Sequence, residues 1–182
     1  MAQLLEVSQS SYFPAFKDLF KETLGALEEA QDITDNLKPL SSQFESFETT
    51  EFDELKSLFD PMYHMICLLW AHSKHYCRPA RIIVLLQELN NLMIRRATEF
   101  LEPLDLFKGE PEESLEKIKV CYGIIDAYQK SYSIHRNKVK EYFKNGLPAR
   151  EWEFAPKLVL ARFDKFLEKL DNIRVNNYKI FI

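Results

Sequence analysis

The sequence predicts an all-α protein, folded as an elongated antiparallel helical bundle of about five helices. Apolar residues recur at steps of three and four along most of the 182 residues, a period that places them on one side of a helix. Only four glycines are present, whereas Leu, Glu and Lys are plentiful, and this composition favours helices. No stretch alternates with a period of two for long enough to predict a sheet.

The first helix is predicted over residues 11–31, followed by a weaker segment. From residue 32 to residue 50, Pro39 and the serine and threonine pairs indicate a connector, with at most a helical turn around Phe44 and Phe47. The apolar face of the first helix carries Phe13, Phe16, Phe20, Leu24 and Leu27.

The densest apolar sequence forms the next two helices, predicted over Phe52–Ser73 and Pro79–Leu101. Pro61 predicts a kink or break near Asp60. Because only a short corner separates the two helices, we expect them to pack antiparallel as a hairpin. The side chains that we expect to be buried in this hairpin are Ile66, Leu69, Trp70, Leu86 and Leu89.

Two further helices complete the predicted bundle. After a loop over residues 102–110, Pro111 begins a helix with acidic residues in its first turn, where the helix dipole favours them. Its stripe extends to Tyr142, roughly 50 Å at 1.5 Å per residue, and Gly146 is the expected cap. The last helix begins near Pro156. We expect Tyr122, Tyr128 and Tyr132 to pack in the core rather than against bases or a cofactor.

The sequence lacks the motifs of common chemical sites. Neither GxxxxGK[ST] nor GxGxxG occurs, so we expect no phosphate cradle, no cofactor, no catalytic residue and no ATP turnover by this chain. The net charge of −4 argues against a nucleic-acid partner, and no apolar run reaches the ~18 residues of a membrane span. Three cysteines without a framework spacing, and no signal-peptide pattern, predict an intracellular protein with free thiols.

One group of metal-ligand residue types surrounds the corner between the central helices, at helical spacings that allow a zinc site to be drawn. None of the common zinc spacings is present, so packing and capping roles are favoured and no metal is expected. The group consists of His64, Cys67, His72, His75 and Cys77.

Two regions are candidates for contact with partners. The first, here called the basic corner, consists of Lys74, His75, Tyr76, Arg78 and Arg81. A solvated helix end is the simpler interpretation of its charges, and partner docking is the alternative. The second is the phenylalanine stripe of the first helix, Phe13, Phe16 and Phe20. If these rings stay uncovered they mark a contact site, and self-association through the two chain ends is then expected.

The central hairpin resembles the amino-terminal tail region of dynein heavy chains, of the axonemal type. The residues that carry the resemblance are ICLLW at Ile66–Trp70, SKHY at Ser73–Tyr76 and PARIIVLLQE at Pro79–Glu88, continuing to Asn90. FDELKSLFDP at Phe52–Pro61 resembles the family's lead-in helix, and the residues from Trp152 to Leu167 resemble a later segment. The likeness covers residues 35–174.

The resemblance implies a non-catalytic tail segment that serves assembly and docking of a microtubule motor to subunits, cargo or the axonemal doublet. The implied partners are dynein intermediate and light chains and other heavy chains, in the axoneme of a cilium or flagellum. The implied division is an amino-terminal helix over residues 1–34, a tail-like bundle over 35–176 and a short tail over 177–182. The alternative function is an independent helical adaptor, with a metal-binding corner as its extreme form.

Overall fold

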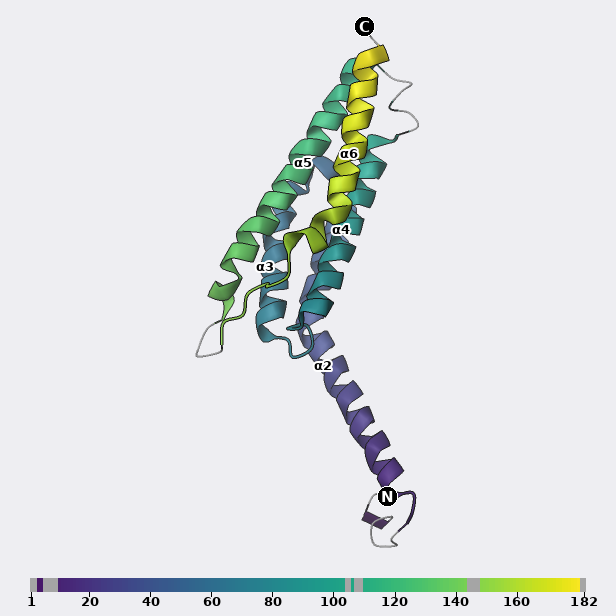
Figure 1. Ribbon diagram of the computed structural model, residues 1–182, viewed down its shortest axis with the longest axis vertical. Helices are drawn as coiled ribbons and strands as arrows, with labels where there is room; N and C mark the ends of the chain where they lie inside the picture. Colours follow the sequence, from purple (N-terminus) through teal and green to yellow (C-terminus); the bar gives the residue numbers. More distant parts are fainter. Residues whose placement is uncertain (1–2, 5–9, 104–105, 107–109, 144–147, 181–182) are drawn as a thin grey trace.

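The computed structural model describes residues 3–4, 10–103, 106, 110–143 and 148–180, where the regular elements are all helical. Figure 1 shows an elongated bundle in which α2, α4 and α6 run one way and α3 and α5 run the other. The predicted all-α, elongated antiparallel bundle is therefore confirmed. The helices are α2 (Phe13–Thr49), α3 (Lys56–His72), α4 (Pro79–Leu101), α5 (Pro111–Lys138) and α6 (Pro156–Ile180), with 3-10 turns at Phe52–Glu54 and Val139–Tyr142.

Helix α2 is one continuous element of 37 residues that passes through Pro39. The predicted connector over residues 32–50 is wrong. The carboxyl-terminal half of α2 packs on α3, and burial of its apolar face outweighs the unfavourable helix propensity of the proline. The predicted boundary after residue 34 falls inside this helix. The residues of the packed face are Leu37, Leu40, Phe44 and Phe47.

Helices α3 and α4 form the expected antiparallel hairpin (Figure 1). The five side chains predicted to be buried in it are each 2% exposed or less, which confirms that prediction. Helix α3 is not broken at Pro61, however; a 3-10 turn over Phe52–Glu54 precedes it instead. Phe59 and Met62, on either side of the proline, are both buried, and this packing keeps the helix continuous.

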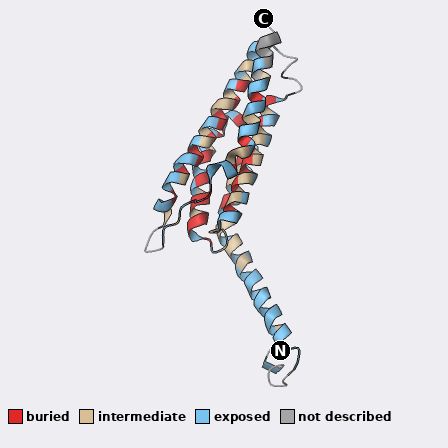
Figure 2. Cartoon of the chain, in the orientation of Figure 1, coloured by how far each residue is buried: buried red, intermediate tan, exposed pale blue. Residues whose placement is uncertain are grey.

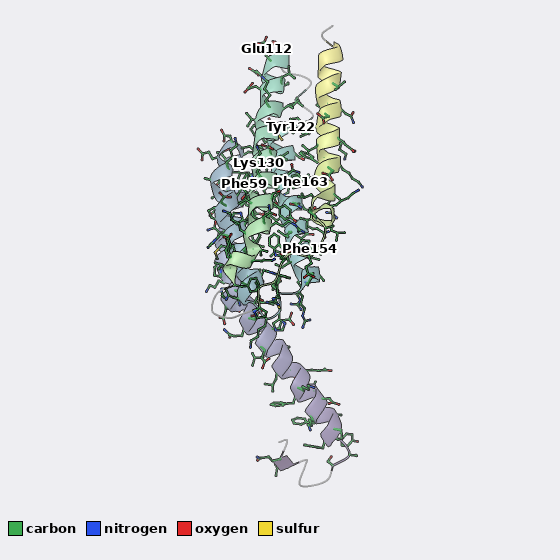
Figure 3. All side chains as sticks on the ribbon, turned by 60° about the vertical axis from the view of Figure 1, so that its left-hand side comes forward. Phe59, Glu112, Tyr122, Lys130, Phe154 and Phe163 are labelled. Atoms are coloured by element: carbon green, nitrogen blue, oxygen red, sulfur yellow. The ribbon has the colours of Figure 1, made fainter. Side chains whose placement is uncertain are left out.

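The centre of the bundle is an aromatic cluster around Tyr128 of α5. Its ring centroid lies 5.3 Å from that of Phe59 on α3, 5.4 Å from Tyr63 on α3 and 5.3 Å from Phe163 on α6. Phe59 and Phe163 are labelled in Figure 3 at the middle of the bundle. Rings from three helices thus meet at one residue, as expected for a tyrosine placed in the core rather than in a binding site.

A buried polar residue joins the fourth helix to this cluster. The Tyr128 hydroxyl donates a hydrogen bond of 2.6 Å to Asn90 Oδ1 on α4. Asn90 Nδ2 in turn donates to the carbonyl of Val159 on α6, also at 2.6 Å. Asn90 is only 1% exposed, and these bonds offset the cost of burying its amide.

The remaining sequence predictions concern α5 and α6. Tyr128 and Tyr132 are buried as predicted, and half-buried Tyr122 donates to Asp171 of α6 at 2.7 Å. The start of α6 at Pro156 is confirmed, whereas the predicted cap at Gly146 lies outside the described residues. Across the described helices, none combines the length and the apolarity that a membrane crossing needs.

Candidate docking surfaces

The backbone of the basic corner is held by a carboxylate of α2 that the sequence did not single out. Asp32 Oδ1 accepts the N–H of Lys74 at 3.0 Å, and Asp32 Oδ2 accepts the N–H of His75 at 3.2 Å. The Ser73 hydroxyl donates to Asp32 Oδ2 at 2.5 Å and accepts the N–H of Tyr76 at 2.8 Å. Asp32 therefore accepts hydrogen bonds from the first backbone N–H groups of the turn that follows α3.

A second carboxylate one turn earlier on α2 binds the side chains of the corner. Glu29 Oε1 lies 2.5 Å from Arg81 Nη1, and Glu29 Oε2 lies 3.7 Å from His75 Nδ1. The Arg81 guanidinium also lies over the Tyr76 ring, 5.7 Å from its centroid. Together, Glu29 and Asp32 attach α2 to the corner, and we call this pair of residues with their contacts the carboxylate clasp.

Both carboxyl groups of the clasp have lowered pKa values. The hydrogen bond from Arg81 is the main reason that the pKa of Glu29 is lowered. Burial alone would raise the pKa of Asp32, but hydrogen bonds from Ser73, Lys74 and His75 outweigh it and lower that pKa below its ordinary value of 3.8. A group whose pKa is lower in the folded state stabilises the fold above its unfolded pKa and loses that contribution as the pH falls.

We expect the clasp to open on acidification below about pH 4, before the aromatic core unfolds, because protonation removes the ionised acceptors of Glu29 and Asp32. Amide hydrogen exchange of Lys74 and His75, followed by NMR against pH, measures this opening. In Asp32→Asn the exchange should be fast at neutral pH and should lose the Asp32-dependent part of its pH response. Asp18→Asn, an exposed change on the same helix, is the control and should behave as the wild type. Unaltered protection of both amides in Asp32→Asn would contradict this role.

The carboxylate clasp reduces the number of side chains of the basic corner that are fully exposed to a partner. Arg81, His75 and Tyr76 are half-buried against the corner and α2, whereas Lys74 and Arg78 remain exposed. Docking of a partner at these five residues stays a prediction. Glu29 lies within the helix predicted over residues 11–31 and Asp32 directly follows it, but no pattern in the sequence indicated that this part of α2 reaches the corner.

The side chains of the alternative metal corner do not converge. His64 Nδ1 pairs with the Tyr142 hydroxyl at 2.9 Å, and the Cys67 thiol contacts the carbonyl of His135 at 3.9 Å. Burial raises the pKa of Cys67 to about 12, so this thiol remains protonated and is a poor metal ligand. Within the described ranges, no three His, Cys, Asp or Glu side chains are grouped so as to hold a metal ion. The geometry gives the metal-binding form of the adaptor hypothesis no support.

The amino-terminal half of α2 projects beyond the bundle, and its residues are largely exposed (Figures 1 and 2). Phe20 is 55% exposed, Leu24 45% and Leu27 65%, so three large apolar side chains along this half of the helix are uncovered. Phe13 and Phe16 are half-buried. We define the α2 stripe as Phe13, Phe16, Phe20, Leu24 and Leu27.

The α2 stripe and the packed face of α2 lie on opposite sides of the same helix. At about 100° per residue, Phe20 and Leu40 are related by roughly 200°, and Leu24 and Leu40 by roughly 160°. Leu40 is 1% exposed, on the side that packs against the bundle. A partner that covers the α2 stripe therefore approaches from the side facing away from α3.

Residues 1–175 match the family model of the dynein heavy chain, N-terminal region 1. The chain is 44% identical over 174 residues to the ciliary dynein beta chain of Heliocidaris crassispina and 42% identical over 173 residues to dynein axonemal heavy chain 11 of Sus scrofa. It is 32% identical over 170 residues to the dynein beta chain of the flagellar outer arm of Chlamydomonas reinhardtii.

These alignments cover 96%, 95% and 93% of this chain but only 4% of each relative. The chain thus corresponds to a small part of much longer proteins. The family match extends over nearly all of its length, and the matched relatives are ciliary, axonemal and flagellar dynein chains. The resemblance carried by the central hairpin is confirmed: the chain belongs to the dynein heavy chain family, as an N-terminal region of the axonemal type.

Proposed function

We propose that this chain is a non-catalytic tail segment of an axonemal dynein heavy chain, which assembles a microtubule motor in the axoneme of a cilium or flagellum. Its docking element is the α2 stripe. The observation that carries this proposal is the exposure of a row of large apolar side chains on a helix that extends past its own bundle. Such patches in soluble proteins mark contact sites.

Other subunits of the motor are the partners that fit this surface: another heavy chain, an intermediate chain or a light chain. Helix α2 has its own backbone hydrogen bonds satisfied within the helix, so a partner must bind its side chains. An amphipathic helix laid along the α2 stripe buries the rings of Phe16 and Phe20. Because the packed face of α2 lies on the opposite side from the α2 stripe, a partner can bind the stripe without displacing the contacts between α2 and α3.

Replacing both Phe16 and Phe20 by Glu should abolish docking, because two carboxylates then enter the apolar contact. The measurement uses the tagged 182-residue chain, incubated with a dynein extract from axonemes. Bound heavy, intermediate and light chains are quantified with specific antibodies. We expect at least a tenfold loss of the bound subunit, with circular dichroism unchanged because the altered side chains lie outside the core.

Leu158→Glu is the matched control, because Leu158 is also 55% exposed but belongs to α6 and not to α2. This variant should bind subunits as the wild type does. Light scattering of the isolated chain at high concentration tests the accompanying expectation of self-association. A strictly monomeric wild-type chain, together with subunit binding that is equal in the double variant, would overturn the proposed docking role.

A further inference from the structure

A groove follows one face of α4, and α2 forms its opposite wall along the carboxyl-terminal part. Two adjoining cavities of about 430 and 470 Å³ share Leu85 and Glu88 of α4. Each volume lies within the range that is typical of ligand-binding pockets. Phe44 and Glu48 of α2 form the opposite wall of one cavity. The residues of α4 that follow the groove are Arg81, Leu85, Glu88, Leu92 and Arg95, spaced four, three, four and three, so they share one face of the helix.

Ion pairs between α2 and α4 close the groove at both ends. Glu29 binds Arg81 at 2.5 Å at one end, and Glu48 binds Arg95 at 2.8 Å at the other. Both partners advance along their helices in the same order, so α2 and α4 run parallel, as Figure 1 also shows. Between the two pairs, α4 rises by roughly 21 Å, the length of about four helical turns.

A helix fits such a groove better than an extended peptide does. Apart from Tyr76 of the corner, the lining comes from α2 and α4, whose backbone groups are already bonded within each helix, so these helices offer no main-chain pairing to an extended peptide. The floor is apolar, with Phe44, Leu85 and Leu92 only half-buried and Leu89 beneath them. An amphipathic helix of about four turns covers these side chains with residues at steps of three and four.

The charge on the groove defines the occupant further. Arg81 and Arg95 are both neutralised by α2, whereas exposed Glu88, at the middle of the groove, has no ion-pair partner in the part of the chain that the structure describes. We propose that the groove between α2 and α4 binds a short amphipathic helix of a partner protein that carries a lysine or arginine opposite Glu88. This site is separate from the α2 stripe and does not depend on it.

The test uses two synthetic helical peptides of about sixteen residues, each with leucines at steps of three and four. One has a lysine at the flank of its apolar face, and the other has a glutamate there. Fluorescence anisotropy measures their binding to the full 182-residue chain. All chains carry Phe16→Glu and Phe20→Glu, so that binding to the α2 stripe does not contribute. A failure to bind either peptide therefore does not bear on docking at the α2 stripe. Likewise, a failure of docking at the α2 stripe does not change the result of the peptide test.

The lysine peptide should bind the wild-type groove about tenfold more tightly than the glutamate peptide, since one pair attracts and the other repels. Glu88→Lys should reverse that order. Glu45→Lys, on the exposed side of α2, should not reverse it. Leu85→Glu should weaken both peptides by tenfold or more. No binding of either peptide, or an order of affinities that Glu88→Lys does not reverse, would overturn the proposal.

Discussion

Replacing Tyr128 by Ala should lower the free energy of unfolding by about 3–5 kcal/mol, the cost of deleting a large aromatic side chain from a core. Tyr128 is fully buried and its ring contacts rings from α3 and α6. The change removes these contacts and leaves a cavity between α5 and the three helices around it, which cannot all move in to fill it. Urea unfolding followed by circular dichroism measures the loss, and a change below about 1 kcal/mol would contradict the central position of Tyr128.

Tyr128→Phe separates the ring from its hydroxyl. Burial raises the pKa of Tyr128 far above its ordinary value, so the phenol stays protonated and donates to Asn90. Without that donor, Asn90 Oδ1 is buried and unpaired, and the expected loss is about 1–3 kcal/mol. The pair Tyr128→Phe and Asn90→Leu, made together, should recover part of this loss because both polar partners are then absent.

Leu86→Ala should cost about 2–5 kcal/mol of unfolding free energy. Leu86 lies on the buried face of α4 and is 0% exposed, so truncation leaves a void among well-packed neighbours. Thermal unfolding of this variant should also occur at a lower temperature than that of the wild type, in one cooperative transition.

Val84→Ala on the same helix is the comparison for Leu86. Val84 is 56% exposed, and its truncation should change the unfolding free energy by no more than about 0.5 kcal/mol. Equal effects at the two positions would contradict the assignment of Leu86 to the core. The contrast is informative because the two residues lie two positions apart within one helix and differ strongly in burial.

The amphipathic periods of α3, α4 and α6 were sufficient to predict these helices, and those of α3 and α4 also predicted five of the buried side chains. Helix α2 was not predicted correctly beyond residue 31, because local propensity at Pro39 and the flanking serines opposes a helix there. The helix persists since its apolar face packs on α3, an interaction between segments that local rules do not consider. The steps of three and four from Leu37 to Phe47 were the available signal.

The candidate surfaces were predicted less completely than the fold. The sequence indicated the phenylalanines of α2 and the cations of the corner as candidate contact residues. It did not show that Glu29 and Asp32 bind that corner, because the pairing depends on how α2 crosses the end of α3. The groove likewise depends on the spacing of α2 and α4, and such a distance between helices has no signature within either segment.

Because α2 is unbroken, the number of residues along it sets the angle between its two contact faces. The direction in which the α2 stripe points is set only by the number of residues between Leu27 and Leu40, since one rigid helix carries both faces. One inserted residue turns the α2 stripe by about 100° and moves it by about 1.5 Å, without altering any side chain in either contact. Four inserted residues return it to within about 40° of its original heading, displaced by about 6 Å. The length of this segment thus determines the direction, about the α2 axis, in which a partner of the α2 stripe lies relative to the bundle.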